Sequence, residues 1–266
     1  TAVGIDVSKD KLDVHVLPSG QAWAVKRDAA GLAELCRRLE GMSGIVAVEA
    51  TGGYESVVAA SLSSAGLPLV MVNPAQVRAF AKALGQRAKT DPIDAAVIAR
   101  FVEATKPVVR PLPDQATRLL SDLLARRRQI VNMMTAETLR LQRTDVARVR
   151  KSITRLLQAL ERELGGVDKD IDDSVRGSPV WRAKEDLLAS VPGVGKVIAR
   201  TMVADLPELG TLGRKQISAL AGLAPFVRQS GKCKGQARIG GGRPVVRTAL
   251  FIGAQTAKQH NPVLKA

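Results

Sequence analysis

Four acidic residues lie where predicted strands end and where a predicted helix begins. Asp6 interrupts the first apolar run of the chain, and Glu49 ends a later one. Asp91 and Asp94 are three positions apart in a predicted helix, so their side chains share one face. Carboxylate oxygens from separate elements suit Mg²⁺ or Mn²⁺, and two such ions can stabilise the attacking and leaving oxygens of a phosphodiester. The four acids therefore predict a metal-dependent site for phosphoryl chemistry.

Each of these acids also has an ordinary explanation. A single Asp6 on an edge strand would simply face solvent. Asp91 and Asp94, in the first turn of a helix, would compensate the positive end of the helix dipole without any catalysis. Glu49 is more informative, because it is followed by residues 51–53, Thr-Gly-Gly, a loop that can approach a phosphate. Two acids at neighbouring strand ends are more informative than one, but the separate explanations stay open at this point.

A second candidate centre surrounds Ser230. Residues 209–266 contain no Asp or Glu, and ten Lys and Arg residues in this segment account for most of the net charge of +15. Ser230 lies between Arg228 and Lys232, so it could attack a phosphate while the cations stabilise the developing negative charge. A serine in a glycine loop is more often an ordinary turn residue. Because the chain has only two histidines, a Ser-His-Asp triad is not arguable.

The basic C-terminal segment and one glycine turn predict a nucleic-acid surface. Residues 192–196, Pro-Gly-Val-Gly-Lys, resemble a helix-hairpin-helix turn, whose backbone N–H groups contact a phosphate without reading sequence. An ordinary turn between two helices explains the same residues equally well. The residues that we expect in the surface are Gly193, Gly195, Lys196, Arg228, Lys232, Lys234, Arg238, Arg243 and Arg247.

The elements that would position the acids follow an alternating α/β pattern. The predicted strands are residues 3–6, 12–16, 22–25, 45–48 and 69–72, and the predicted helices are residues 31–39, 54–65, a segment starting at Pro74, and 91–104. A three-stranded meander followed by alternating helices and strands predicts a mixed α/β sheet. Thr90 is a suitable N-cap for the helix that carries the last two acids. The layout resembles a ribonuclease H-like nuclease core, nearest to the RuvC type.

The second half of the chain has a different, mainly helical pattern. An arginine-rich tract of about residues 115–164 has apolar residues at spacings of three, four and seven, which predicts two helices or one interrupted coiled coil. Gly165, Gly166 and the acidic run 168–173 are expected to break this pattern. A third region begins near Ser178 and contains the glycine turn. The predicted domains are residues 1–106, 107–177 and 178–266.

Bulk composition narrows the classes of function. With 266 residues, 45% of them hydrophobic, the chain can form one large or two smaller cores, and the excess of 40 Lys and Arg over 25 Asp and Glu favours nucleic acid as a partner. No apolar run approaches the roughly 18 residues of a membrane-spanning helix. Cys36 and Cys233 lack the spacing of a zinc site or a disulfide framework, so we expect a cytoplasmic location. A start at Thr1 is compatible with a fragment.

Taken in order, the motifs resemble the DEDD transposases of the insertion sequence 110 family, relatives of the Piv and MooV DNA invertases. They span almost the whole chain: Gly4-Ile5-Asp6-Val7-Ser8-Lys9, Val48-Glu49-Ala50-Thr51-Gly52, Val72-Asn73-Pro74, Lys89-Thr90-Asp91 with Asp94-Ala95, Pro192-Gly193-Val194-Gly195, and Ala221-Gly222-Leu223 through Ser230-Gly231. The resemblance implies a RuvC-like domain in which Asp6, Glu49, Asp91 and Asp94 bind Mg²⁺ (or Mn²⁺). It also implies a coiled-coil linker that contacts a second copy, and a mainly α-helical transposase domain.

The same resemblance implies a mechanism and partners. Ser230 would be the nucleophile and would form a phosphoserine link to DNA in an active site shared with the carboxylates. Family members bind a structured noncoding RNA, the bridge RNA, whose loops pair with donor and target DNA, so the protein would read backbone and shape. The low aromatic content, 3%, agrees with little stacking on bases. A dimer or tetramer is expected. Family chains commonly continue with further helices beyond the position of Val263, and any contact they supply would be missing here.

Two other interpretations compete with a transposase. A RuvC-like junction resolvase would hydrolyse DNA with water and metal and would need no serine. An architectural DNA-binding or RNA-binding protein would use the glycine turn and the basic segment, with the acids as helix caps. Metal-dependent strand cleavage separates the enzymes from the binding protein, and denaturant-resistant attachment to DNA separates a transposase from a resolvase.

Overall fold

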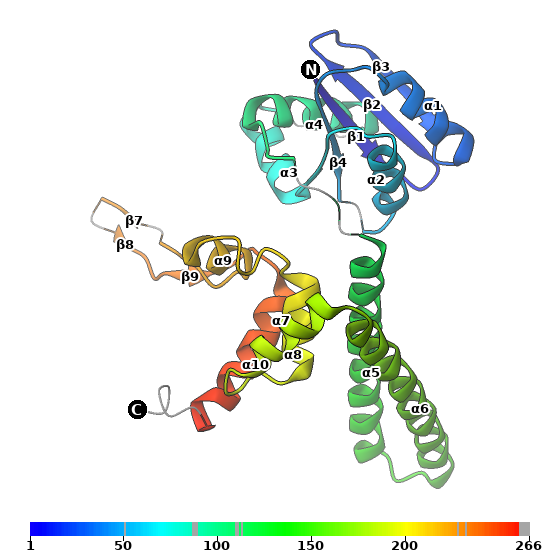
Figure 1. Ribbon diagram of the computed structural model, residues 1–266, viewed down its shortest axis with the longest axis vertical. Coiled ribbons are helices and arrows are strands. Elements are labelled where there is room, and N and C mark those ends of the chain that lie inside the picture. The colour runs from blue at the N-terminus through cyan, green and yellow to red at the C-terminus, as the bar shows by residue number, and fades with distance from the viewer. Residues whose placement is uncertain are drawn as a thin grey trace. The chain divides into compact units, whose positions relative to one another are not determined.

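The computed structural model describes residues 1–50, 52–86, 90–109, 112, 114–227, 229–231 and 233–260 (Figure 1). The chain divides into two compact units, Thr1–Leu112 and Pro113–Ala266. The arginine-rich helices and the basic C-terminal segment both belong to the second unit. Among the helices of the described ranges, none has the length and apolar character needed to cross a membrane.

The first unit is built around a mixed five-stranded sheet. Its strands are β1 (Ala2–Val7), β2 (Lys11–Leu17), β3 (Ala22–Lys26), β4 (Ile45–Glu49) and β5 (Leu69–Val72), in the order β3-β2-β1-β4-β5. The meander β1-β2-β3 is antiparallel, whereas β4 and β5 continue the sheet in parallel with β1. The predicted mixed α/β sheet is therefore confirmed, with β1 and β4 as neighbours near its centre.

Helices cover both faces of this sheet, as Figure 1 shows. They are α1 (Ala29–Leu39), α2 (Glu55–Ser64), α3 (Pro74–Ala83) and α4 (Asp91–Thr105). Side chains alternate along a strand, so Val3, Ile5 and Val7 pack with α1 and α2, while Ala2 packs with α3 and α4. By the same alternation Gly4 and Asp6 face α4.

Gly4 allows α4 to lie directly on β1. A Cβ atom at Gly4 would come within 2.2 Å of the Ala95 carbonyl oxygen and 2.4 Å of the Ala99 nitrogen. Both atoms belong to the backbone of α4, so they cannot move aside as a side-chain end could. The glycine, two residues before Asp6, therefore brings the first turns of α4 against the strand that carries the first acid.

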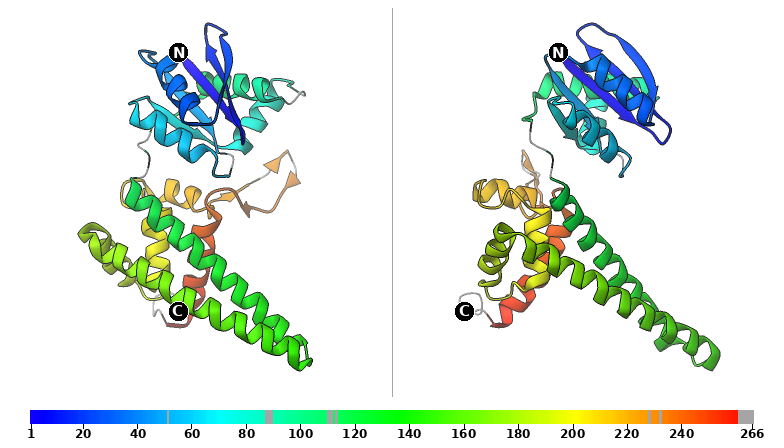
Figure 2. Two further views of the ribbon diagram at one scale, coloured as in Figure 1. Left: turned by 90° about the vertical axis from the view of Figure 1, so that its right-hand side faces the viewer. Right: turned by 45° about the vertical axis from the view of Figure 1, so that its right-hand side comes forward.

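The second unit is mainly helical. It contains α5 (Gln115–Arg143), α6 (Ala147–Gly177), α7 (Pro179–Ala189), α8 (Lys196–Asp205), α9 (Arg214–Leu220), β6 (Pro225–Phe226), β7 (Gln229–Ser230), β8 (Cys233–Lys234), β9 (Arg238–Ile239) and α10 (Pro244–His260). Figure 2 shows α5 and α6 side by side as an antiparallel pair. Leu120 and Leu124 of α5 are buried with Ile171 and Val175 of α6, so part of the predicted apolar stripe packs within the chain.

The predicted break at Gly165 and Gly166 is wrong, because α6 runs without interruption to Gly177. Each glycine disfavours a helix by roughly 1 kcal/mol relative to alanine. This cost is offset by packing that local composition does not show. Val167, Ile171 and Val175, at intervals of four, form one buried face of the helix beyond the glycines. The acidic run belongs to the same helix and supplies partners for arginines of neighbouring helices.

Candidate active site

The structure gathers the four predicted acids at one cavity of the first unit. Asp6, Glu49, Asp91 and Asp94 all line a hollow of about 570 Å³. The parallel pairing of β1 and β4 aligns Ile5 with Val48, which puts the next residue of each strand side by side. The other two acids come from the first turn of α4, which the glycine contact holds against β1.

The acids lie close enough to disturb one another electrostatically. The pKa of Asp6 is raised to about 6, first by burial and then by the negative charges of Asp94, Asp91, Glu49 and Asp13, in that order of size. Such mutual repulsion is what a cation placed among the carboxylates would relieve. The pKa shift therefore supports a common site for acids from three separate elements.

Asp13 is a fifth acid that the sequence analysis did not single out. It stands on β2 directly opposite Asp6 in the antiparallel pair, and it is buried. Residues opposite each other in such a pair point to the same face of the sheet. The sequence did contain a signal for Asp13. Polar residues stand at every second position, Lys11, Asp13 and His15, so they give this strand one polar side.

Lys11 joins two of these acids. Its Nζ atom lies 3.0 Å from Oδ2 of Asp13 and 3.0 Å from Oδ2 of Asp91. Hydrogen bonds to Asp13 and then to Asp91 hold the pKa of Lys11 above its ordinary value. Two further cations, Arg78 and Lys82 of α3, are exposed and line the same cavity. Sequence reasoning missed all three cations, because they come near the acids only when the helices pack on the sheet.

The donor chemistry of the cavity fits a hard divalent cation, because every candidate ligand is a carboxylate. The spacing is more open than in a completed ligand shell. Among the described residues, no group of three or more His, Cys, Asp or Glu side chains is arranged to hold one metal ion. The acids are gathered at one place, and a bound ion would have to draw them closer together.

Ser230 belongs to the second unit and lies near the tip of a β-hairpin arm. The arm has two short strand pairs, β6 with β9 and, beyond it, β7 with β8 (Figure 1). Ser230 pairs with Cys233 and is exposed, and the adjacent Gly231 has a φ of 54°, which suits a tight turn. The sequence indicated only a glycine loop here. Arg228 and Lys232 lie outside the described residues.

The base of the arm is fixed by close backbone contact and by arginines. A Cβ atom at Gly242 would come within 2.3 Å of the Gly222 nitrogen, so the two ends of the arm touch. Arg247 donates from Nη1 to the Gly241 carbonyl over 2.8 Å. Arg243 makes two hydrogen bonds to the Glu208 carboxylate, of 2.5 and 2.7 Å. These arginines, predicted to bind nucleic acid, are occupied within the fold.

The glycine turn lies between α7 and α8, where a turn between two helices was predicted. A Cβ atom at Gly193 would meet Ala257 Cβ at 2.7 Å and the Gly253 oxygen at 2.8 Å, so this glycine serves the packing of α10. Gly195 has open space around it, and Lys196 is exposed at the first turn of α8. Arg238, on β9, is exposed as well. For Lys234 only the backbone is described.

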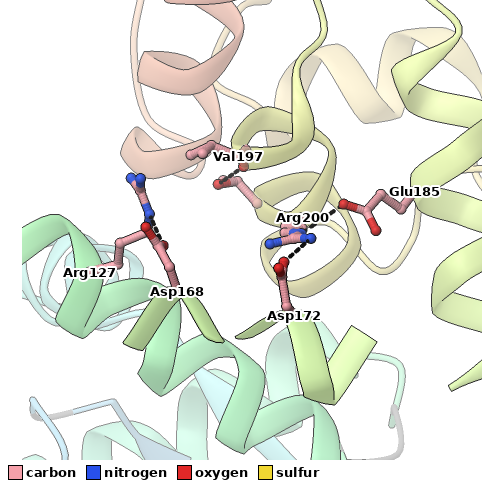
Figure 3. A network of polar contacts seen from close by, with 7 residues as sticks. Arg127, Asp168, Asp172, Glu185, Val197 and Arg200 are labelled. Atoms are coloured by element: carbon pink, nitrogen blue, oxygen red, sulfur yellow. Dashed lines mark hydrogen bonds and ion pairs between the residues drawn. The ribbon is translucent and has the colours of Figure 1, made fainter. Parts of the chain in front are cut away.

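A buried ion-pair network holds the α7–α8 pair in place (Figure 3). Arg200 of α8 is 9% exposed and donates from Nε to Glu185 of α7 over 2.7 Å. Its Nη2 atom lies 2.5 Å from Asp172 of α6, and the hydrogen bond lowers the pKa of Asp172. Arg127 of α5 pairs with Asp168 of α6 over 2.7 Å. The network is structural, and sequence reasoning missed it.

Comparison with known proteins assigns most of the chain to one family. Residues 3–144 match a transposase family model for DEDD enzymes of the IS110 type, and residues 185–266 match the model described as transposase IS116/IS110/IS902 family. The chain belongs to the IS110 family of transposases. As an IS110-family protein it is a DNA-rearranging enzyme, so the predicted family and the predicted enzyme class are confirmed.

Curated relatives agree with the family assignment. The chain is 28% identical over 265 residues to the pilin gene-inverting protein of Moraxella bovis, covering 96% of this chain and 82% of the relative. The pilin gene-inverting protein of Moraxella lacunata is 27% identical with the same coverage. The predicted relationship of this IS110-family chain to DNA invertases is thereby confirmed.

Proposed function

We propose that this IS110-family enzyme cleaves and rejoins DNA strands with metal-binding carboxylates in the first unit and Ser230 in the second. The observation that carries the carboxylate part is the convergence of four acids from three elements on one cavity, with the pKa of Asp6 raised by burial and by the charges of the others. A solvent-facing acid or a helix-capping acid would have no reason to meet acids from other elements.

The residues that would hold the ion are Asp6, Glu49, Asp91 and Asp94. Bound Mg²⁺ or Mn²⁺ would stabilise the attacking and leaving oxygens of the phosphodiester. The chain's own residues orient the substrate. Arg78 and Lys82, exposed at the same cavity, are suited to hold DNA phosphates beside the carboxylates, which would otherwise repel them.

Ser230 supplies the nucleophile in this proposal. Its Oγ atom forms a bond to phosphorus as the bond from phosphorus to a sugar oxygen breaks, and in net terms the serine proton passes to that leaving oxygen. Attack by another strand's hydroxyl then reverses the step and releases the serine. The covalent intermediate keeps the phosphodiester energy for rejoining, which hydrolysis would lose. The exposed position of Ser230 on the arm supports access of DNA to the hydroxyl.

We further propose that a bridge RNA selects the DNA and that two or four copies assemble. Exposed apolar residues near the joined ends of α5 and α6, namely Leu139, Val149 and Leu156, offer a contact for a second copy. Leu139→Asp combined with Val149→Asp should lower the mass measured by light scattering. Wild-type protein that is a monomer at all accessible concentrations would end the oligomer proposal.

The serine is tested with purified protein, its copurified RNA and labelled DNA. We expect a species that survives detergent, with the label on the peptide that contains Ser230. Ser230→Ala should bind DNA and fail to form this species, whereas Ser152→Ala, at an exposed serine of α6, should form it normally. If the Ser230 variant still joins strands, the nucleophile is not this serine. Metal-dependent cleavage without an adduct would favour a resolvase that uses water.

A further inference from the structure

Lys11 occupies a position between the carboxylates where a cation is needed. The ammonium group touches Asp13 on β2 and Asp91 on α4 at 3.0 Å each. Asp13 is directly opposite Asp6, and like charges in that position destabilise an antiparallel pair. Lys11 and Asp13 are two residues apart on one strand, so their side chains lie on the same face. The lysine therefore neutralises part of the charge that this face accumulates.

The two contacts of Lys11 differ in how easily each carboxylate can give up the lysine for another cation. The Asp13 side chain is 7% exposed, whereas the Asp91 side chain is 45% exposed. Breaking the contact to Asp13 would leave a buried carboxylate without its counter-charge, which is costly. An exposed ion pair such as that with Asp91 contributes little, because water screens it. The lysine is anchored at Asp13 and readily exchanged at Asp91.

We propose that Lys11 is a built-in counter-ion, anchored by Asp13, that holds Asp91 until a divalent cation takes this carboxylate over. The inference rests on the proposed function, because it assumes that the acids bind metal. It accounts for the open spacing of the acids, since Asp91 is engaged by the lysine. It also assigns positioning roles to Lys11 and Asp13, which lie outside the four-acid set.

The lysine and the metal ion then compete for one carboxylate. A positive charge beside the carboxylates weakens their attraction for a metal ion. Removing that charge should therefore strengthen metal binding. Without metal the same removal leaves the acids to repel one another, and the folded state loses stability. A lysine that merely pointed Asp91 toward the metal would give the opposite result for binding, because its loss would disorder a ligand.

Lys26 provides a matched control. It is exposed on β3 and is aligned with Lys11 in the β2–β3 pair, so Lys26→Met makes the same change of charge and side chain one strand away. Mn²⁺ binding to the full-length protein is measured by calorimetry, and thermal unfolding is measured in chelator. Lys11→Met should bind Mn²⁺ roughly three- to tenfold more tightly than wild type. In chelator its melting temperature should fall below that of Lys26→Met.

A second measurement uses the wild-type chain and does not depend on a variant that folds. Amine-reactive labelling followed by mass spectrometry, with and without Mg²⁺, reports how freely each lysine reacts. Release from Asp91 should increase labelling of Lys11 severalfold when Mg²⁺ is added, while Lys26 serves as the internal reference and stays constant.

The outcomes separate this inference from the proposed function. If wild type binds Mn²⁺ and Lys11→Met binds it no more tightly than Lys26→Met does, the counter-ion role is overturned and the metal site stands. Weaker binding by Lys11→Met, or Lys11 labelling that Mg²⁺ leaves unchanged, overturns it as well. If wild type binds no divalent ion at all, the metal part of the proposed function fails together with this inference.

Discussion

Charged side chains are arranged differently in the two units. In the first unit, acids from β1, β4 and α4 converge on one cavity, and burial together with the charges of nearby acids, Asp13 of β2 included, raises the pKa of Asp6. In the second unit, acids and arginines pair with each other, as Arg200 does with Glu185 and Asp172. Clustered acids whose repulsion is only partly relieved are expected where a cation is to bind, whereas matched ion pairs are expected where charge serves folding. The contrast helps to separate functional charge from structural charge.

The largest effect should come from removing one acid of the cavity. Asp94→Asn keeps the shape of the side chain and removes one charge, so it should abolish metal-dependent DNA cleavage while DNA affinity stays broadly intact. Gel-based cleavage and filter binding measure the two properties. Glu103→Gln, at an exposed acid farther along α4, should retain full activity. Full activity of Asp94→Asn would remove this residue from the site.

The network of the second unit should respond in stability. Arg200→Met leaves Glu185 buried without its partner, so the free energy of unfolding should fall by about 3–5 kcal/mol. Chemical denaturation followed by circular dichroism measures the loss. Arg182→Met, at an exposed arginine of α7, is expected to change stability by about 0.5 kcal/mol or less. An equal effect of both variants would mean that the network contributes little.

Gly4→Ala tests how α4 is held on β1. The added methyl group would meet backbone atoms of Ala95 and Ala99, so we expect a loss of about 1–3 kcal/mol in the free energy of unfolding. Since α4 carries Asp91 and Asp94, metal affinity should fall as well. Unchanged stability and unchanged metal affinity would show that the contact does not position the acids.

The raised pKa of Asp6 has a consequence for stability against pH. A carboxyl whose pKa is about 6 when folded and 3.8 when unfolded stabilises the fold below pH 3.8, and this stabilisation is lost as the pH rises through 6. The metal-free wild type should therefore lose stability relative to Asp6→Asn between pH 4 and 7. Thermal unfolding in chelator measures the difference, with Asp10→Asn as an exposed control. A constant difference across this range would contradict the pKa shift.

The smallest effect should come from a glycine that packs against nothing. Gly165 is exposed in α6, and a Cβ atom added there meets open space. Gly165→Ala should raise the free energy of unfolding by about 0.5–1 kcal/mol, because alanine favours the helix. The same chemical change thus has opposite signs at Gly4 and at Gly165. A destabilised Gly165→Ala would point to a role of this glycine beyond the helix itself.

The sequence predicted the first unit better than the second. Strands and helices of the first unit are short, alternate regularly, and have a buried side, so periodicity identifies them within a residue or two. In the second unit the helix break at Gly165 was wrong, because buried residues beyond the glycines sustain α6. The arm that carries Ser230 was not foreseen, since strands of two residues have no detectable periodicity.

What the sequence determined by itself was the alternation of the sheet, the acids at Asp6, Glu49, Asp91 and Asp94, and the excess of positive charge near the C-terminus. Those features depend on residue type and short spacing. Only the tertiary structure decided that Gly4 holds α4 on β1, that Lys11 bridges two acids, and that Arg243 is paired with Glu208. Each of these features depends on a contact between residues distant in the chain. Local spacing determines on which face of an element a side chain lies. Its partner depends on which other element packs against that face.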